Sequence, residues 1–145
     1  MATRTATTRW TGGLHDGSGS VELTTSGVGN FTVSLPTRVA ERAGGSTSPE
    51  ELLAAAQTAC YAMQLSALLS EAGVTELALE VTADVTLGPD SAGGFRIVEI
   101  ALEVRSAGRG VTETILGDAA QIAKDTCPVS KALSGTSIRV TSALA

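Results

Sequence analysis

The sequence has few of the residues that mark several common classes of protein. It contains two cysteines and one histidine in 145 residues, and these do not make a convincing zinc site, which takes four ligands. Its ten basic residues are scattered among fifteen acidic ones, and the net charge is -5. DNA- and RNA-binding proteins gather Lys and Arg to neutralise phosphates. Neither a bound metal nor a nucleic-acid partner is therefore expected.

Long uninterrupted hydrophobic segments are also missing. Residues 1–13 carry Thr and Arg with no apolar stretch behind them, so no secretory signal is expected and the predicted location is cytoplasmic. The most apolar region, residues 52–69, is interrupted by Gln57 and Gln64 and preceded by two glutamates. We interpret this region as a helix of the protein core and expect no membrane span.

The composition that remains is that of a soluble globular protein, with 43% hydrophobic and 17% charged residues. There is no internal repeat and no long linker, and a chain of this length buries one continuous core, so residues 1–145 are expected to form a single domain. A structural disulfide does not persist in a reducing compartment. Cys60 and Cys127 are therefore either two inert buried thiols or a redox-active pair.

Residue patterns predict strands at both ends of the chain and in its middle. Residues 4–10, 18–23 and 31–35 are rich in Thr, Val and aromatic residues and are separated by glycine-containing turns, which is typical of a β-meander. Residues 36–47 have no periodicity and are predicted to form a mobile surface loop. Residues 79–87 alternate strictly between apolar and polar, residues 98–104 continue that pattern in an antiparallel partner, and residues 138–140 predict a last strand.

Helices are predicted between these strands. Ser48 to Glu51 form a capping box with proline at the first helical position, which predicts a long helix ending near Glu71, before Gly73. Apolar side chains point in nearly every direction around this helix, so we expect it to be buried on most sides. Residues 111–125 have helical spacing, and residues 129–133 predict a short final helix.

This order of elements predicts an α+β fold in which two small antiparallel sheets wrap central helices. Two small sheets from a single chain of this size have too little surface to cover the apolar helix over residues 49–71. We therefore expect a homodimer, since symmetric pairing is the commonest way to bury such a surface.

The two cysteines differ in their local sequence. Cys60 lies mid-helix among alanines and leucines, where it is typical of a packed core thiol. Cys127 precedes Pro128 and so occupies the N-cap of the short final helix, where free N–H groups and the helix dipole favour a thiolate. Two thiols in a chain with few other candidate catalytic groups fit a pair that cycles between dithiol and disulfide.

Two segments carry a resemblance to a known family. The run TSPEELLAAAQTACYAM, residues 47–63, followed far downstream by AKDTCPVS, residues 123–130, resembles the osmotically inducible protein C and organic hydroperoxide resistance (OsmC/Ohr) family. The resemblance covers essentially the whole chain in length and element order. It implies an intertwined homodimer of two sheets around central helices, with active sites at the subunit interface.

The resemblance also implies a reaction, the reduction of organic hydroperoxides in defence against oxidative stress, with hydrogen peroxide as a further candidate substrate. The thiolate of Cys60 attacks the peroxide and becomes a sulfenic acid, and Cys127 condenses with it to a disulfide. An external dithiol, typically a lipoyl group on a partner protein, then reduces the disulfide. No metal or organic cofactor is implied. The alternative is a noncatalytic relative that binds a small apolar molecule while both thiols stay reduced.

A buried cysteine needs a nearby positive charge to ionise, because burial alone raises its pKa. The resemblance maps the family's arginine to Arg38 and its glutamate to Glu50, with Arg42 as the rival for the arginine. Placement of this arginine shortly before the long helix resembles the OsmC branch of the family. Without the resemblance, Arg38 is a solvated loop charge and Glu50 a first-turn glutamate favoured by the helix dipole.

Three further residues are candidates for an apolar substrate pocket. Phe31, Tyr61 and Met63 offer the surface that alkyl or aryl hydroperoxides require, and each also fits core packing. His15 lies in a predicted turn and is given no role.

Overall fold

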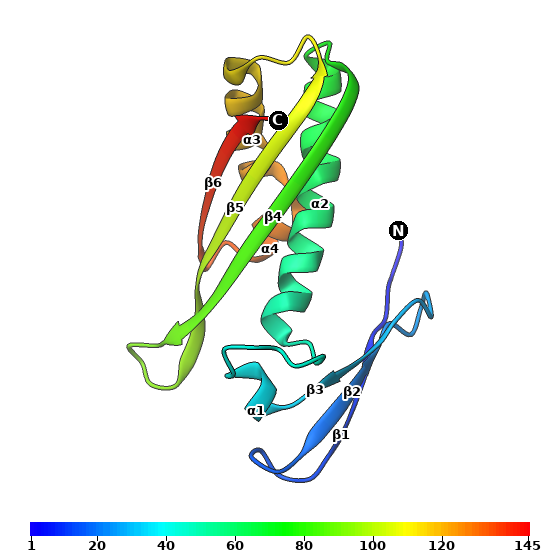
Figure 1. Cartoon of the computed structure of the whole chain (residues 1–145), viewed down its shortest axis with the longest axis vertical. Helices are drawn as coiled ribbons and strands as arrows, with labels where there is room; N and C mark the ends of the chain where they lie inside the picture. The colour runs from blue at the N-terminus through cyan, green and yellow to red at the C-terminus, as the bar shows by residue number, and fades with distance from the viewer. The chain divides into compact units, whose positions relative to one another are not determined.

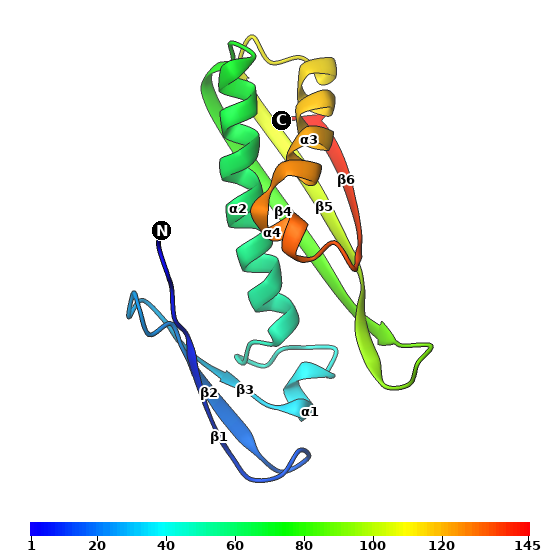
Figure 2. The ribbon, with the colours of Figure 1, turned by 180° about the vertical axis from the view of Figure 1, so that it is seen from behind.

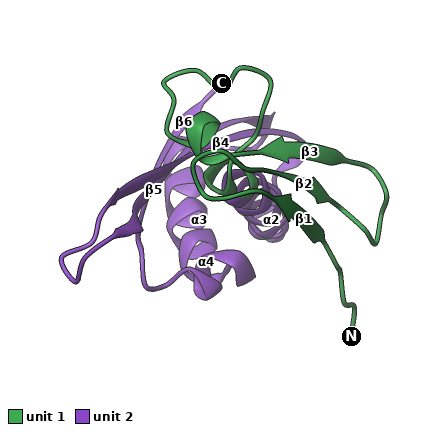
Figure 3. Ribbon diagram, turned by 90° about the horizontal axis from the view of Figure 1, so that it is seen from below, with its two compact units in different colours: residues 1–52 green, residues 53–145 purple.

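The computed structural model describes residues 1–145. The chain divides into two compact units, residues 1–52 and residues 53–145 (Figure 3). Each unit is described by itself, and the organisation of the chain as one domain stays a prediction.

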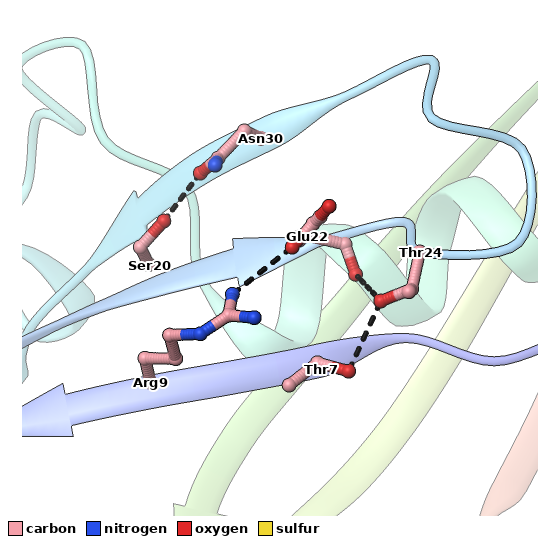
Figure 4. A network of polar contacts seen from close by, with 6 residues as sticks. All are labelled: Thr7, Arg9, Ser20, Glu22, Thr24 and Asn30. Carbon is pink, nitrogen blue, oxygen red and sulfur yellow. Dashed lines mark hydrogen bonds and ion pairs between the residues drawn. The ribbon is translucent and has the colours of Figure 1, made fainter.

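The first unit contains a three-stranded antiparallel sheet in the order β1-β2-β3 (Figure 1). Its strands are β1 (Thr7–Thr11), β2 (Ser18–Glu22) and β3 (Asn30–Val33). The β-meander expected from the Thr- and Val-rich segments is thus confirmed. Polar side chains tie the strands together, as Figure 4 shows for the pairs Arg9–Glu22, Ser20–Asn30 and Thr7–Thr24.

A short helix follows the sheet where a loop was predicted. Helix α1 (Leu35–Arg38) begins after Ser34, whose side chain accepts a hydrogen bond from the Thr37 N–H at 3.3 Å. Pro36 in the first turn is compatible with a helix because its missing N–H has no partner there in any case. The prediction of a mobile loop over residues 36–47 is therefore wrong at its start. The physical consequence is that Arg38 lies on a helical turn.

Helix α2 (Pro49–Glu71) begins and ends as the sequence predicts. The Ser48 hydroxyl accepts from the Glu51 N–H at 3.2 Å. At the other end Gly73 has φ 87° and Val74 N–H bonds to the Leu69 carbonyl at 3.0 Å, which closes the helix in the left-handed conformation that glycine favours. In a capping box the Glu51 carboxylate would accept from the Ser48 N–H. Here it accepts from the Thr47 hydroxyl instead.

The second unit is built on a mixed three-stranded sheet in the order β4-β5-β6. Strands β4 (Thr75–Pro89) and β5 (Phe95–Arg109) form a long antiparallel hairpin that extends beyond the predicted strands at both ends. Strand β6 (Ser137–Leu144) pairs with β5 in parallel. Its direction follows from its connection, because a chain that returns through helices enters the sheet in the direction of the strand it left.

Helices α3 (Glu113–Thr126) and α4 (Pro128–Ala132) make that connection. Figures 1 and 2 show them, together with α2, on one face of the β4-β5-β6 sheet. The core between these layers contains Tyr61, Leu65, Leu69, Val74, Leu102, Val104, Leu116, Ala119, Ala123 and Cys127. The α+β class with two small sheets is confirmed, but the prediction that both are antiparallel is wrong for the second sheet, because β6 pairs with β5 in parallel.

Within one chain, burial of α2 beyond its first turn is confined to a stripe of residues four apart, Gln57, Tyr61, Leu65 and Leu69. Other apolar positions are exposed, most clearly Met63 at 71%. The expectation of burial on most sides therefore does not hold for the single chain. By length and composition α2 also suffices to cross a membrane, but core helices of soluble proteins pass the same test.

Candidate active site

The two cysteines come together in the second unit although 67 positions separate them in the chain. Cys60 lies on α2 and Cys127 stands at the junction of α3 and α4. The Cys127 N–H completes α3 by bonding to the Ala123 carbonyl at 2.9 Å, and Pro128 starts α4. Both thiols are free, and each is among the neighbouring groups that shift the pKa of the other. The fold thus brings the two thiols near each other.

The two sulfurs differ in exposure. Cys127 is 0% exposed and belongs to the core, whereas Cys60 is partly buried and packs against that core. Within the chain, only Cys60 of the two therefore has exposed surface.

The surroundings shift the pKa values of the two thiols in opposite directions. Burial raises the pKa of both sulfurs. For Cys127 the N–H groups of Ser130 and Val129, the Cys60 thiol and the Ser130 hydroxyl outweigh burial, and its pKa is lowered. For Cys60 burial dominates, and the neighbouring Cys127 adds to it, so its pKa is raised although Val129 N–H opposes the change. The pair by itself thus favours a thiolate at Cys127.

A buried polar contact lies directly beside Cys127. The Gln57 amide donates from Nε2 to Ser130 Oγ at 2.7 Å, and both residues are inside the unit. Gln57 Oε1 has no hydrogen-bond partner in the chain. This contact was missed by the sequence analysis, although a glutamine in the stripe of Tyr61, Leu65 and Leu69 was a signal for it.

The first unit holds the predicted arginine and glutamate in an ion pair. Arg38 Nη2 bonds to Glu50 Oε1 at 2.6 Å, and Arg38 Nε lies 3.1 Å and 3.2 Å from the two carboxylate oxygens. This fork geometry fixes the guanidinium plane. Arg42, the rival candidate, is exposed and takes part in no ion pair of the chain.

The charges of this pair are mutually stabilised. Burial raises the pKa of Glu50, but hydrogen bonds from Arg38 and Ser48 and the charge of Arg38 outweigh it, so the net pKa is lowered. The pKa of Arg38 is raised by its bond to Glu50. Both side chains are therefore ionised at neutral pH.

An apolar hollow of about 290 Å³ lies beside Arg38 in the same unit. Its lining is Trp10, Leu14, Val33, Ser34, Leu35, Arg38 and Pro49. The hollow presents one cationic group to a mainly apolar wall. Sequence reasoning missed Trp10, Leu14 and Leu35, because the lining is formed around α1, which was predicted as a loop.

The three residues proposed for a substrate pocket lie elsewhere. Tyr61 is 0% exposed, and its hydroxyl donates to the Ala120 carbonyl at 2.7 Å. Phe31 is on β3 and Met63 on the exposed side of α2, and neither lines the hollow beside Arg38. Tyr61 is thus a core residue within the chain. His15 is exposed between β1 and β2.

An α+β chain in which two free thiols from distant segments lie near each other belongs to the class of small proteins with a paired-thiol site. Comparison with known proteins identifies the family. Residues 42–143 match the model of the OsmC-like protein family, and the chain is a member of that family.

Named relatives agree with this membership. The chain is 38% identical to peroxiredoxin OsmC of Escherichia coli over 124 residues, 86% of this chain and 85% of that protein. It is 35% identical to the organic hydroperoxide resistance protein OhrA of Bacillus subtilis over 104 residues, covering 71% and 72% of the two chains.

Solved structures show the same fold. An organic hydroperoxide resistance protein from Elizabethkingia anophelis is similar with a TM-score of 0.78 at 30% identity, over 100% of this chain and 98% of that one. OhrB of Bacillus subtilis is similar with a TM-score of 0.77 at 27% identity, over 98% of both chains.

Proposed function

We propose that this protein is a thiol-dependent peroxidase that reduces organic hydroperoxides in defence against oxidative stress. The observation that carries the proposal is the contact between the Cys60 and Cys127 thiols in a chain of the OsmC family. The names of its relatives, a peroxiredoxin and organic hydroperoxide resistance proteins, support the same activity.

The oxidative half of the reaction uses Cys60 as nucleophile. Its thiolate attacks the outer peroxide oxygen, a sulfur–oxygen bond forms, and the oxygen–oxygen bond breaks to release an alkoxide that takes a proton and leaves as an alcohol. The Cys127 thiolate then attacks the Cys60 sulfur and displaces hydroxide, which is protonated to water. Each turnover transfers two electrons from the two thiols to the peroxide and leaves the protein with one disulfide.

Arg38 is proposed to ionise Cys60 and to stabilise the departing alkoxide. The ion pair with Glu50 supports this role because it holds the guanidinium in one plane while leaving its charge in place. Glu50 is thus proposed as the residue that orients Arg38.

An external dithiol completes the cycle. Because Cys127 has no exposed surface and Cys60 does, we propose that the reductant attacks the Cys60 sulfur and releases Cys127 as a thiolate. The second thiol of the reductant then closes its own disulfide and frees Cys60. A lipoyl group on a partner protein has the required chemistry.

The organic part of the substrate is proposed to occupy an apolar surface near Arg38. The hollow lined by Trp10, Leu14 and Leu35 supports this preference, since hydrogen peroxide has no apolar group to bury there. Phe31 and Met63 remain candidates for substrate contacts, whereas Tyr61 is buried in the core.

A homodimer is proposed as the working form. The exposed apolar side of α2, with Met63 at 71% and Ala55, Ala56, Ala59 and Ala67 around it, is a surface that a second copy would cover. The proposed compartment is the cytoplasm, whose thiol pools keep both cysteines reduced between turnovers.

Intact-mass analysis tests the peroxidase. One equivalent of cumene hydroperoxide is expected to lower the mass of the wild-type chain by about 2 Da as the disulfide forms. Cys127→Ser is expected to gain about 16 Da as a sulfenic acid that a dimedone probe captures. Cys60→Ser is expected to stay unchanged.

Two outcomes contradict the proposal. A wild-type chain that stays reduced through many equivalents of cumene, tert-butyl and fatty-acid hydroperoxides would instead be the noncatalytic binding protein. Oxidation of Cys60→Ser at the wild-type rate would assign the attack to Cys127.

A further inference from the structure

The contact between Gln57 and Ser130 has no part in the reaction as written above. Gln57 is 0% exposed and Ser130 4% exposed, so both polar side chains are removed from water. They join α2 to α4 from positions 73 residues apart, with 2.7 Å between Gln57 Nε2 and Ser130 Oγ. A buried glutamine costs free energy unless its polar atoms are paired, and here Oε1 is unpaired. Such a residue calls for an explanation other than packing.

The local geometry directs the Ser130 hydroxyl. Cys127 is the N-cap of α4 and Ser130 lies three residues later, within the first turn of that helix. The backbone confirms the helical turn, since Lys131 N–H bonds to the Cys127 carbonyl at 3.0 Å. The Ser130 side chain is accordingly among the groups that lower the pKa of Cys127.

The proton of that hydroxyl is the deciding detail. Gln57 donates to Ser130 Oγ, which occupies a lone pair of the oxygen and leaves its O–H free to donate to sulfur. If the Gln57 amide were rotated by 180°, Oε1 would accept the hydrogen bond from the Ser130 hydroxyl. That hydroxyl could then no longer donate to the Cys127 sulfur. The two orientations of one buried amide therefore set whether Ser130 stabilises a thiolate.

We propose that Ser130 donates a hydrogen bond to the Cys127 thiolate each time that sulfur carries negative charge, and that Gln57 is the positioning residue that keeps the Ser130 proton directed at it. The role rests on the proposed thiol–disulfide cycle. It applies when Cys127 attacks the Cys60 sulfenic acid and again when an external dithiol breaks the disulfide and the electron pair leaves on Cys127. In both steps the hydrogen bond stabilises negative charge on the Cys127 sulfur, which is one of the reacting atoms.

The test measures the disulfide itself. The wild-type chain and the Ser130→Ala, Gln57→Leu and Gln57→Glu variants are oxidised with diamide and equilibrated with dithiothreitol mixtures of known potential. Loss of a hydrogen bond to a thiolate is expected to make the Cys60–Cys127 disulfide about ten-fold harder to reduce in Ser130→Ala, which is a potential lower by about 30 mV. Gln57→Leu is expected to change in the same direction by less.

Gln57→Glu separates positioning from packing. Its carboxyl group has nearly the shape of the amide, and burial raises its pKa, so the measurement is made at a pH where it is ionised and only accepts hydrogen bonds. There it is expected to draw the Ser130 proton away from sulfur and to make the disulfide at least as hard to reduce as in Ser130→Ala. Ser106→Ala is the matched control, because Ser106 is a buried serine on β5 whose hydroxyl has no partner. It is expected to leave the potential unchanged.

A second measurement follows Cys127 alone. In a Cys60→Ser background, thiolate absorbance near 240 nm is titrated with pH, and Ser130→Ala is expected to move the midpoint to higher pH. Potentials and midpoints that match the wild type in Ser130→Ala and in both Gln57 variants overturn the proposal. Because diamide replaces the hydroperoxide, these results stand even for a chain that does not reduce peroxides, and failure of the peroxidase is seen separately by intact mass.

Discussion

Replacing Glu50 by glutamine removes the charge that Arg38 faces while keeping the shape of the side chain. In the native chain the carboxylate accepts from Arg38 Nη2 at 2.6 Å and from Nε at 3.1 Å. A glutamine keeps one acceptor oxygen and presents an NH₂ group to a cation, so at least one charge-assisted bond is lost and the guanidinium loses its counter-charge.

The size of the effect follows from exposure. Bonds to charged groups contribute about 1.5–3 kcal/mol each, but solvent screening reduces the value of exposed pairs to about 0–1 kcal/mol. The Arg38 side chain is 34% exposed and that of Glu50 is 11% exposed, which places the pair between these limits. We expect Glu50→Gln to lower the free energy of unfolding by about 1–2 kcal/mol, and the melting temperature by roughly 3–6 °C for a chain of this size.

Glu22→Gln is the matched control. Glu22 also pairs with an arginine, Arg9, at 3.0 Å, but those side chains are 36% and 70% exposed. Its removal is expected to cost less than about 0.5 kcal/mol. Urea unfolding of both variants at one protein concentration makes the comparison, since a dimer's stability depends on concentration. Equal losses in the two variants would refute the assigned difference between a partly buried pair and a surface pair.

The pH dependence has a definite sign. The folded-state pKa of Glu50 is lowered, so the folded chain binds a proton less readily than the unfolded chain. The stability that Glu50 contributes is therefore fully present above its unfolded pKa of about 4.3 and is lost as pH falls through the folded value. Glu50→Gln is expected to show a smaller loss of stability than wild type between pH 5 and 3.

Three further changes test other parts of the structure. Tyr61→Phe removes the bond to the Ala120 carbonyl and is expected to cost about 1 kcal/mol in urea unfolding, because the helix bond of that carbonyl remains. Leu65→Ala empties a site that is 0% exposed and is expected to cost about 2–5 kcal/mol; a loss below 1 kcal/mol would contradict its place in the core. Met63→Glu puts a charge on the exposed side of α2 and is expected to yield monomers in sedimentation velocity, whereas an unchanged dimer would place the interface elsewhere.

Local chemistry explains which parts of the fold the sequence predicts. Ser48 and Gly73 bound α2 because each supplies a cap that depends on neighbours within the same turn. The alternation over residues 79–87 predicts β4 because its period distinguishes a strand from a helix. Helix α1 was missed since its Ser34 cap precedes a segment too short for any periodicity.

Long-range contacts explain what could not be predicted. The parallel pairing of β6 with β5 is set by how α3 and α4 pack, and the burial of Tyr61 by a carbonyl 59 positions away. The pairing of Cys60 with Cys127 was predicted from the family resemblance. The resemblance implied no role for Gln57 or Ser130. Their contact could not be predicted from the sequence, because it depends on how α2 packs against the start of α4.

The charges of the thiol pair lead to the last prediction. Burial and the neighbouring Cys127 raise the pKa of Cys60, while the start of α4 lowers that of Cys127. The proposed reaction needs the opposite order, so a positive charge from outside the pair has to favour ionisation of Cys60. Arg38→Met is therefore expected to slow cumene hydroperoxide reduction by about 10²-fold at pH 7, comparable to the loss of one donor to a developing oxyanion.

The pH profile distinguishes this role from a structural one. With Arg38 removed, the Cys60 thiol ionises only at higher pH, so the rate of the variant is expected to keep rising between pH 7 and 9 where that of the wild type has levelled. Arg42→Met is the control, because Arg42 is exposed and unpaired, and its rate is expected to stay within about two-fold of wild type. Stopped-flow rates that fall equally in both variants, or an Arg38→Met profile parallel to that of the wild type, would contradict the claim that this guanidinium reverses the order in which the two thiols ionise.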